Sequence, residues 1–232
     1  MTASTAERSR AAAAATPRPK RTPRDQATRS REARAKLLDA TIQVLLEKGY
    51  NGLTTKEVAS RAGLSNGALM HHYANKGDLV VAATAEVYEE CIARGQRTAR
   101  SPQALENPIA GFMADSMAVY FEWPFIAALE VLMVARTDPA LMERIKPVME
   151  HYRRETNTLW LQVFAQAGYA PEQAELALNL TLNQVRGLGV HSLWKPARAA
   201  QEALLEEWLV AAARLFPLPR KARRRAAAAE VS

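Results

Sequence analysis

The sequence predicts an all-α protein, and three observations support this fold class. Apolar residues recur every three to four positions along most of the chain, as they do on one face of an α-helix. No stretch combines strict polar–apolar alternation with Val, Ile and Thr enrichment, so no strand is expected. Glycines and prolines separate the apolar segments where helices commonly end or begin.

The two ends of the chain differ in composition from its centre. Residues 1–36 carry ten basic and three acidic side chains, and residues 217–232 carry five and one, whereas the remainder is mildly acidic. Because residues 1–29 contain three prolines and little to bury, we expect them to form a disordered basic arm, and we expect residues 217–232 to form a similar tail. Basic tails are typical of chains that meet polyanions, but they also serve solubility alone, and composition leaves both readings open.

The first three helices are predicted by local signals, at about residues 31–48, 55–62 and 66–73. Leu38 begins the apolar stripe of the first helix, and Gly49 ends that helix. The hydroxyl of Thr54 or Thr55 can cap the second helix, and that of Ser65 can cap the third. Residues 30–77 are therefore expected to form the N-terminal unit.

The rest of the chain is predicted to be helical as well. A long connecting helix is expected over residues 78–99, followed by a helical bundle over residues 100–216. Trp123-Pro124 interrupts one helical stretch, and Pro147 is expected to kink another. The bundle helices are predicted at about residues 108–122, 125–136, 138–167, 172–191 and 198–216.

Residues 54–79 have the pattern of two short helices that cross over a tight turn. Ala59 is small where the helices would cross, Gly63 allows the positive φ of the turn, and Leu69 would point back into the core. In a helix-turn-helix of this kind the second helix enters the major groove of DNA. The sequence therefore predicts an N-terminal DNA-binding unit of three helices.

The outward face of the third helix supplies the candidate DNA contacts: Asn66, Gly67, Ala68, Met70, His71 and His72. Thr55 could present its backbone N–H and hydroxyl to a phosphate, and Lys76 adds a cation just beyond the reading helix. A metal site at His71 and His72 is not expected, because neighbouring helical side chains point about 100° apart.

Residues 31–79 resemble the N-terminal domain of the TetR/AcrR family of repressors. The matching features are the Thr-x-x-x-Val-Ala-x-x-Ala-Gly-Leu-Ser run, a Gly-x-Leu pair, His72-Tyr73, and a Lys-x-x-Leu ending at Leu79. The resemblance implies DNA contacts from Thr55, Ser65, Asn66, Gly67, Met70, His71, His72 and Lys76. One departure is Met70, because the family often has a phosphate-contacting Tyr there and Met cannot replace that contact.

The resemblance also implies a homodimer that binds an inverted repeat in double-stranded DNA and is released by a small, mostly apolar effector. The last two helices suit this role because each carries apolar residues on more than one side, as at Leu176, Leu180 and Leu205. From the residues alone, these helices could equally close the core of a monomer.

Aromatic and methionine side chains gather in the expected bundle and make an effector pocket plausible. The candidate ligand-binding residues are Met117, Phe121, Trp123, Glu130, Trp160 and Phe164. Ordinary core packing is the alternative for each aromatic side chain. Glu130 is expected to face a ligand amine or to pair with Arg136, and His151 and Arg186 are weaker candidates.

Other classes of function find little support. The sequence contains no phosphate-binding loop, no Gly-x-Ser-x-Gly and no His-Glu-x-x-His, so no catalytic residue, metal or cofactor is predicted. No apolar run approaches the roughly 18 residues that span a bilayer, and we expect a cytoplasmic protein without a membrane partner. The remaining alternative is a DNA-binding or activating protein that responds to no ligand, although the size of the bundle argues against it.

Overall fold

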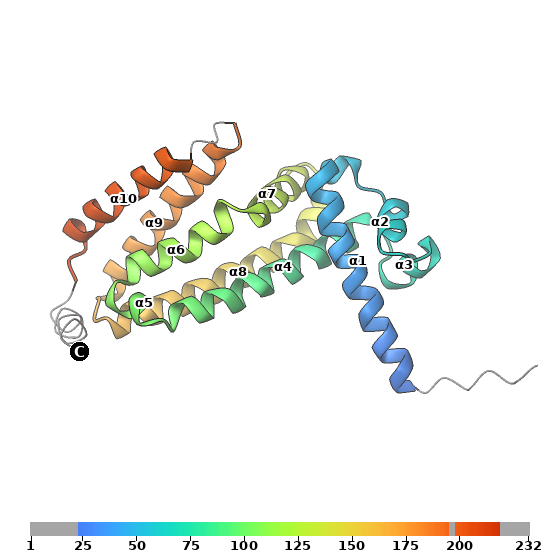
Figure 1. The fold of residues 1–232 in the computed structure, drawn as a ribbon, viewed down its shortest axis with the longest axis horizontal. Coiled ribbons are helices and arrows are strands. Elements are labelled where there is room, and N and C mark those ends of the chain that lie inside the picture. Colours follow the sequence, from blue (N-terminus) through green and yellow to red (C-terminus); the bar gives the residue numbers. More distant parts are fainter. Residues whose placement is uncertain (1–22, 195–197, 219–232) are drawn as a thin grey trace, which may run out of the picture.

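The computed structural model describes residues 23–194 and 198–218, and every regular element within them is a helix, which confirms the all-α class (Figure 1). The helices are α1 (Pro23–Gly52), α2 (Thr55–Arg61), α3 (Asn66–His72), α4 (Lys76–Ala99), α5 (Pro102–Glu106), α6 (Pro108–Tyr120), α7 (Trp123–Ala135), α8 (Pro139–Gln166), α9 (Pro171–Ser192) and α10 (Arg198–Leu215).

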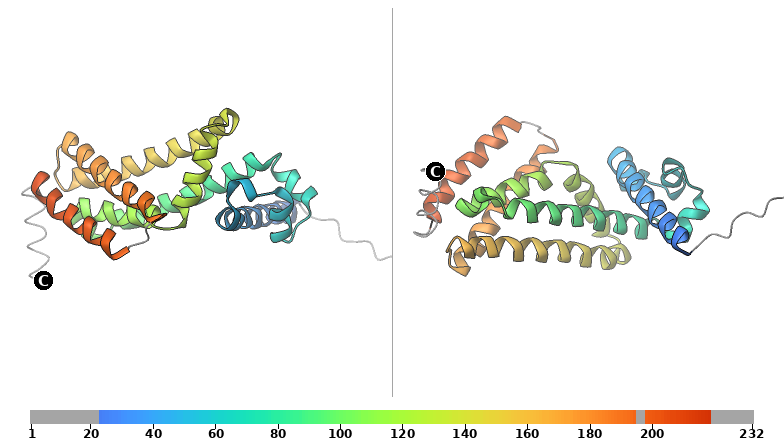
Figure 2. Two further views of the ribbon diagram at one scale, coloured as in Figure 1. Left: turned by 90° about the horizontal axis from the view of Figure 1, so that it is seen from above. Right: turned by 60° about the horizontal axis from the view of Figure 1, so that its bottom comes forward.

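Helices α1 to α3 form a small head at one end of the molecule, and α9 and α10 lie at the opposite end (Figures 1 and 2). The long helices α4 and α8 run side by side between these ends, and α6 packs on α9. Helix α10 lies outermost, against α9 and α6. The head is therefore separated from α10 by most of the length of the bundle.

Two apolar cores account for this arrangement. The first core unites the head with α4, α7 and α8, because Leu37, Val58 and Leu69 pack in one cluster with Val131 and Ile145. The second core fills the opposite end of the bundle, where the buried side chains of Phe112, Trp160 and Phe164 pack with residues of α9 such as Leu178. The head therefore shares its core with α4, α7 and α8.

The helix boundaries differ from the expected ones at several points. Residues 23–29 are the first turns of α1, with Pro23 at the start where a missing N–H costs nothing, so the expected disordered arm is wrong for them. The rest of that arm and residues 219–232 of the tail lie outside the described residues. Gly49 does break the helical conformation, at φ 68°, although α1 resumes to Gly52.

Three further differences concern the bundle. Helix α4 begins at Lys76 rather than residue 78, because the side chain of Asn75 caps it by accepting from the N–H of Asp78. Helix α5 is additional to the expected elements, and α7 begins at Trp123 rather than after the proline. Helix α8 continues through Pro147.

Among the described residues no single helix is long and apolar enough to cross a membrane, although the bent pair of α6 and α7 passes that test by length and composition.

Candidate nucleic-acid interface and ligand cavity

The turn between α2 and α3 holds α3 at a fixed angle to the head. Gly63 adopts φ 68°, a left-handed conformation that favours glycine, and the next N–H, of Leu64, donates to the carbonyl of Ala59 at 2.9 Å. Ser65 then caps α3 by accepting from the N–H of Ala68 at 3.1 Å. Ala59 and Leu69 are buried between the helices, as the sequence pattern predicts.

Ion pairs tie α2 to the end of α1. The guanidinium of Arg61 donates to both carboxylate oxygens of Glu47, at 2.5 and 2.7 Å, and Lys48 pairs with Glu57 at 2.5 Å. The Arg61 guanidinium lowers the pKa of the Glu47 carboxyl. These pairs are exposed, so each contributes little to stability, but the two-point Arg61–Glu47 contact restricts the orientation of α2.

The outer side of α3 is exposed on the described protein. Ser65, Asn66, Gly67, Met70 and His71 are exposed, and Met70 keeps 44% of its surface. A Cβ added to Gly67 would meet only the Ser65 hydroxyl, at 3.8 Å, so the fold itself does not require glycine there. The structure thus brings these five predicted residues together on one open face.

The other predicted DNA contacts are half-buried. Ala68 and Thr55 lie in the first turns of α3 and α2, and His72 is the last residue of α3. Burial lowers the pKa of His72, and the neighbouring charges of His71 and Arg34 lower it further. The lowered pKa favours the neutral ring of His72, which suits it to hydrogen bonding rather than to charge pairing with phosphate.

Lys76 is directed inward in this structure. Its ammonium lies 4.2 Å from the centre of the Tyr50 ring, and burial lowers its pKa while Glu130 opposes that effect. Glu130 itself accepts a 2.6 Å hydrogen bond from the backbone N–H of Tyr50. The expectation that Glu130 faces a ligand amine or pairs with Arg136 is therefore wrong: this carboxylate joins α7 to the end of α1.

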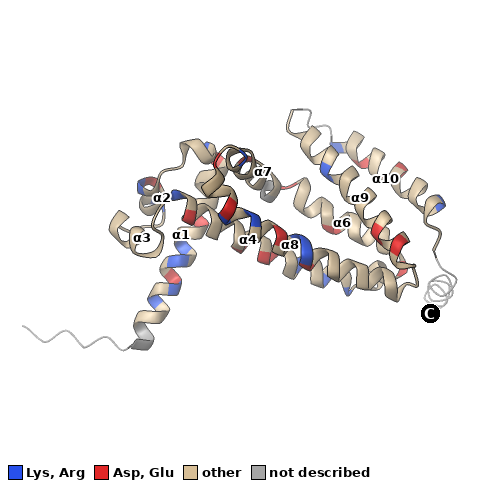
Figure 3. Ribbon diagram, turned by 180° about the vertical axis from the view of Figure 1, so that it is seen from behind, with Lys and Arg blue, Asp and Glu red and all other residues tan. Residues whose placement is uncertain are grey.

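A hollow of about 350 Å³ separates α3 from the first turns of α1. Arg29 and Ser30 line it from α1, and His71 and His72 line it from α3. Basic side chains recur along this part of α1 (Figure 3). The open face of α3 therefore continues onto a basic helix.

A second candidate site lies inside the bundle, where a cavity of about 600 Å³ opens between α4, α6, α7, α8 and α9. An adjoining cavity of about 260 Å³ shares six lining residues with it and reaches toward α7. Volumes of this order are typical of small-molecule sites. The shared residues are Tyr88, Tyr120, Leu132, Met149, Tyr152 and Arg186.

The predicted ligand-binding residues whose side chains are described do not line this cavity. Trp160 and Phe164 are fully buried in the second core, and Met117 and Phe121 pack in a separate cluster with Val185. Glu130 contacts the head instead, and the side chain of Trp123 lies outside the described residues. Other residues of the same region, Tyr120, Phe112 and Arg186, line the cavity instead.

Sequence reasoning missed the contribution of α8. Met142, Lys146, Met149, Arg153 and Asn157 follow one another at three- and four-residue intervals and all line the cavity. The available signal was the pair of basic residues, Lys146 and Arg153, on the stripe that carries Met142 and Met149. A second signal was Asp115, a buried acid in the largely apolar helix α6.

Comparison with known proteins agrees with the geometry of the head. A family model described as "Bacterial regulatory proteins, tetR family" matches residues 37–83. The HTH-type transcriptional regulator CymR of Pseudomonas putida is 35% identical over 177 residues, which cover 76% of this chain and 86% of CymR. These similarities and the helix-turn-helix define a DNA-binding transcriptional regulator, not an enzyme.

Solved structures share this fold over most of the chain. A putative TetR-family regulator from Mesorhizobium loti superposes with a TM-score of 0.65 at 15% identity, over 81% of this chain and 98% of that one. FadR from Bacillus subtilis, solved in complex with stearoyl-CoA, superposes with a TM-score of 0.54 at 16% identity, over 74% of this chain and 95% of that one. The chain belongs to the TetR family of bacterial regulatory proteins.

Proposed function

We propose that this regulator is a homodimeric repressor that binds an inverted-repeat operator through α3 and is released when a small molecule enters the bundle cavity. The division of labour follows the fold: α1 to α3 contact DNA, α4 connects, and α5 to α10 bind the effector and the second subunit. The observation that carries the proposal is the open outer face of α3, held at a fixed angle by the turn at Gly63.

The exposed residues of α3 have the chemistry of base and phosphate contacts. Asn66 can pair with a base edge, and His71 can reach either a base or a phosphate. Gly67 leaves room for close approach of the DNA backbone. Lys76 would have to leave the Tyr50 ring to reach DNA, so its contact depends on movement of the head.

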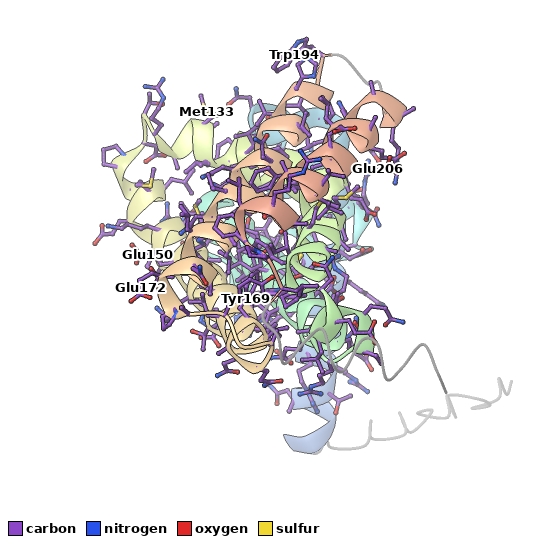
Figure 4. All side chains as sticks on the ribbon, turned by 90° about the vertical axis from the view of Figure 1, so that its left-hand side faces the viewer. Met133, Glu150, Tyr169, Glu172, Trp194 and Glu206 are labelled. Atoms are coloured by element: carbon purple, nitrogen blue, oxygen red, sulfur yellow. The ribbon has the colours of Figure 1, made fainter. Side chains whose placement is uncertain are left out.

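An exposed apolar surface on α9 and α10 supports dimerisation. Leu176 and Leu180 on α9, and Leu204 and Leu215 on α10, keep between 38% and 61% of their surface exposed. A Cβ added to Gly187 would meet nothing within 4 Å, so the outer side of α9 can be approached closely. Figure 4 looks onto this end of the molecule, with Glu206 on α10 and Trp194 just beyond α9. Clusters of exposed leucines commonly mark subunit contacts.

The cavity supports regulation by a small molecule because its walls belong to helices that also hold the head. Leu132 of α7 and Met142 of α8 line the cavity, while Val131 and Ile145 of the same helices pack in the head core. A ligand that favours one spacing of α7 and α8 would therefore favour one placement of the head.

Selection of bound DNA from a random duplex pool tests the central part of this proposal. We expect an inverted repeat whose half-sites are about 34–36 Å or a multiple of it apart, as two symmetric reading helices require. Asn66→Ala and His71→Ala should each abolish the preference at one position of the half-site while leaving folding intact. Equal retention of scrambled and palindromic duplexes would refute sequence-specific binding.

Titration with small molecules tests the regulatory part. A compound that stabilises the folded protein thermally and lowers its affinity for the selected DNA supports an effector-released repressor. Binding of compounds with unchanged DNA affinity would favour a regulator that responds to no ligand.

A further inference from the structure

Two guanidinium groups face the bundle cavity with only neutral partners. Arg153 of α8 donates to the side-chain oxygen of Asn179 at 2.8 Å, and Arg186 of α9 donates to the Tyr120 hydroxyl at 3.1 and 3.4 Å. Both side chains are half-buried, and within the described residues neither forms an ion pair. A half-buried cation without a counter-charge is costly, so the cavity favours an anion.

The proximity of the two cations strengthens this preference. Burial lowers the pKa of Arg153, and the charge of Arg186 lowers it further, so the two guanidiniums repel each other across the cavity. An anion between them would relieve that repulsion and accept several charge-assisted hydrogen bonds.

The other charged groups that line the cavity already have partners. Lys146 and Glu150 pair with each other at 3.6 Å and are both exposed, and the exposed Arg154 lies 3.8 Å from Glu155. The charges of these two pairs therefore offset each other at the solvent side of the cavity. Among the described lining residues, Arg153 and Arg186 are the cations that lack a charged partner.

One buried acid sets the direction in which an anionic ligand would lie. Asp115 accepts a 2.9 Å hydrogen bond from the Trp160 ring N–H, and its other oxygen is 3.9 Å from the Arg94 guanidinium. Asp115 precedes Tyr120 by five residues in α6, a rise of about 7.5 Å along the helix. An anionic head is thus attracted to the arginine end and repelled from the Asp115 end.

Apolar surface occupies the remaining wall. Tyr88 and Tyr152 stack with their ring centres 4.5 Å apart, and they continue with Leu132 and Met149 into the adjoining cavity. The adjoining cavity adds Phe125 and other apolar side chains of α6, α7 and α9. A ligand that binds Arg153 and Arg186 would therefore place an apolar body beside these rings.

We propose that the effector of this regulator is a small organic anion, with a carboxylate-like or sulfonate-like head between Arg153 and Arg186 and an apolar body against Tyr88, Leu132 and Tyr152. This inference rests on the proposed function only in taking the cavity as the effector site. It narrows the effector class from apolar compounds to amphipathic organic acids.

A matched pair of fluorescent probes tests the ligand class on the full chain. 8-Anilinonaphthalene-1-sulfonate and N-phenyl-1-naphthylamine share one apolar body, and only the first carries an anionic head. We expect Arg153→Met combined with Arg186→Met to weaken sulfonate binding tenfold or more while changing the affinity for the neutral probe less than twofold. The control, Arg97→Met combined with Arg100→Met, removes the same charge from exposed positions at the end of α4 and should change neither affinity.

Retained binding of the neutral probe shows that the cavity is intact in the double variant. Equal weakening of both probes, unchanged sulfonate binding, or no saturable sulfonate binding to the unaltered protein would each overturn the proposal. DNA release is measured separately with the same probes. If the sulfonate probe binds through the two arginines but does not release DNA, the repressor mechanism alone is refuted. If the sulfonate probe releases DNA equally from the unaltered protein and the double variant, the ligand class alone is refuted.

Discussion

Replacing Glu130 tests how firmly the bundle holds the DNA-binding head. In the folded protein this carboxylate accepts a 2.6 Å hydrogen bond from the Tyr50 N–H, and it lies close enough to Lys76 to influence its pKa. Glu130→Ala removes a partly buried, charge-assisted hydrogen bond and leaves the N–H without its partner. A loss of about 1.5–2 kcal/mol in the free energy of unfolding is expected, at the low end of the range for charged groups because the site is only partly buried.

Urea denaturation at fixed protein concentration measures this loss. Glu130→Gln keeps an oxygen acceptor and should lose about half as much, whereas Glu143→Ala, an exposed site on α8, should change stability by less than about 0.5 kcal/mol. Equal stability of Glu130→Ala and the unaltered protein would show that the contact between α7 and α1 contributes nothing.

The same variant addresses communication between the cavity and DNA. Leu129 and Leu132 line the adjoining cavity on either side of Glu130 in sequence, so a ligand that moves α7 should move the end of α1 through this contact. In Glu130→Ala, a ligand that releases DNA should bind with unchanged affinity but should change DNA affinity severalfold less. An unchanged ratio of DNA affinities with and without that ligand would refute this route.

Three further outcomes are expected. Gly67→Ala should leave the protein as stable, or up to about 1 kcal/mol more stable in urea denaturation, because alanine favours helix. The same change should weaken DNA binding, because the added methyl lies on the face presented to the groove. Unchanged DNA affinity would contradict that placement. Removal of residues 1–22, which leaves α1 whole, should flatten the salt dependence of DNA binding by about one unit of slope for each phosphate that the arm neutralises, and an unaltered slope would show that this arm does not touch DNA. Burial raises the pKa of Asp115 in the folded protein above its unfolded pKa, which is near 3.8. The contribution of Asp115 to the stability of the fold is therefore fully present below the unfolded pKa and is lost as the pH rises through the folded pKa. Asp115→Asn should therefore gain stability relative to the unaltered protein between pH 4 and pH 7.5, and a difference that does not change with pH would contradict the assignment.

The head could be predicted in detail from the sequence because its signals are local. The positive φ of Gly63, the cap at Ser65 and the buried Leu69 all depend on residues within one or two helical turns. The partner of Glu130 could not be predicted in this way, because Tyr50 lies 80 residues earlier in the chain. A glutamate amid apolar residues signals a special contact but does not identify its partner.

The residues that line the cavity could not be identified from the sequence, and α8 shows why. Arg153, Asn157 and Trp160 lie at four- and three-residue intervals on one stripe, yet the first two line the cavity and Trp160 is fully buried beside it. Helical periodicity identifies the inward face of a helix. It does not identify where along that face the neighbouring helices separate, because that depends on packing from α6 and α9.

Helix α9 shows the same limit at the surface. Its sequence carries two apolar stripes, and the structure buries Leu178 and Val185 of one while it exposes Leu176 and Leu180 of the other. Five-residue α5 escaped prediction for a related reason: its buried residue Ala104 is held by tertiary packing rather than by a long apolar pattern.

The arrangement of the cores suggests why ligand and DNA binding should oppose each other. If the head had a core of its own, movement in the bundle could leave it unchanged. Instead α7 and α8 contribute to the head core through Val131 and Ile145, and each adds a polar contact, Glu130 with Tyr50 and Arg144 with Asp78. Packed cores resist gradual deformation. A change in the spacing of α7 and α8 therefore either does not occur or moves α1 and α4 as well. In the proposed dimer, an effector would need only to favour one spacing of these two helices to alter the separation of the two reading helices.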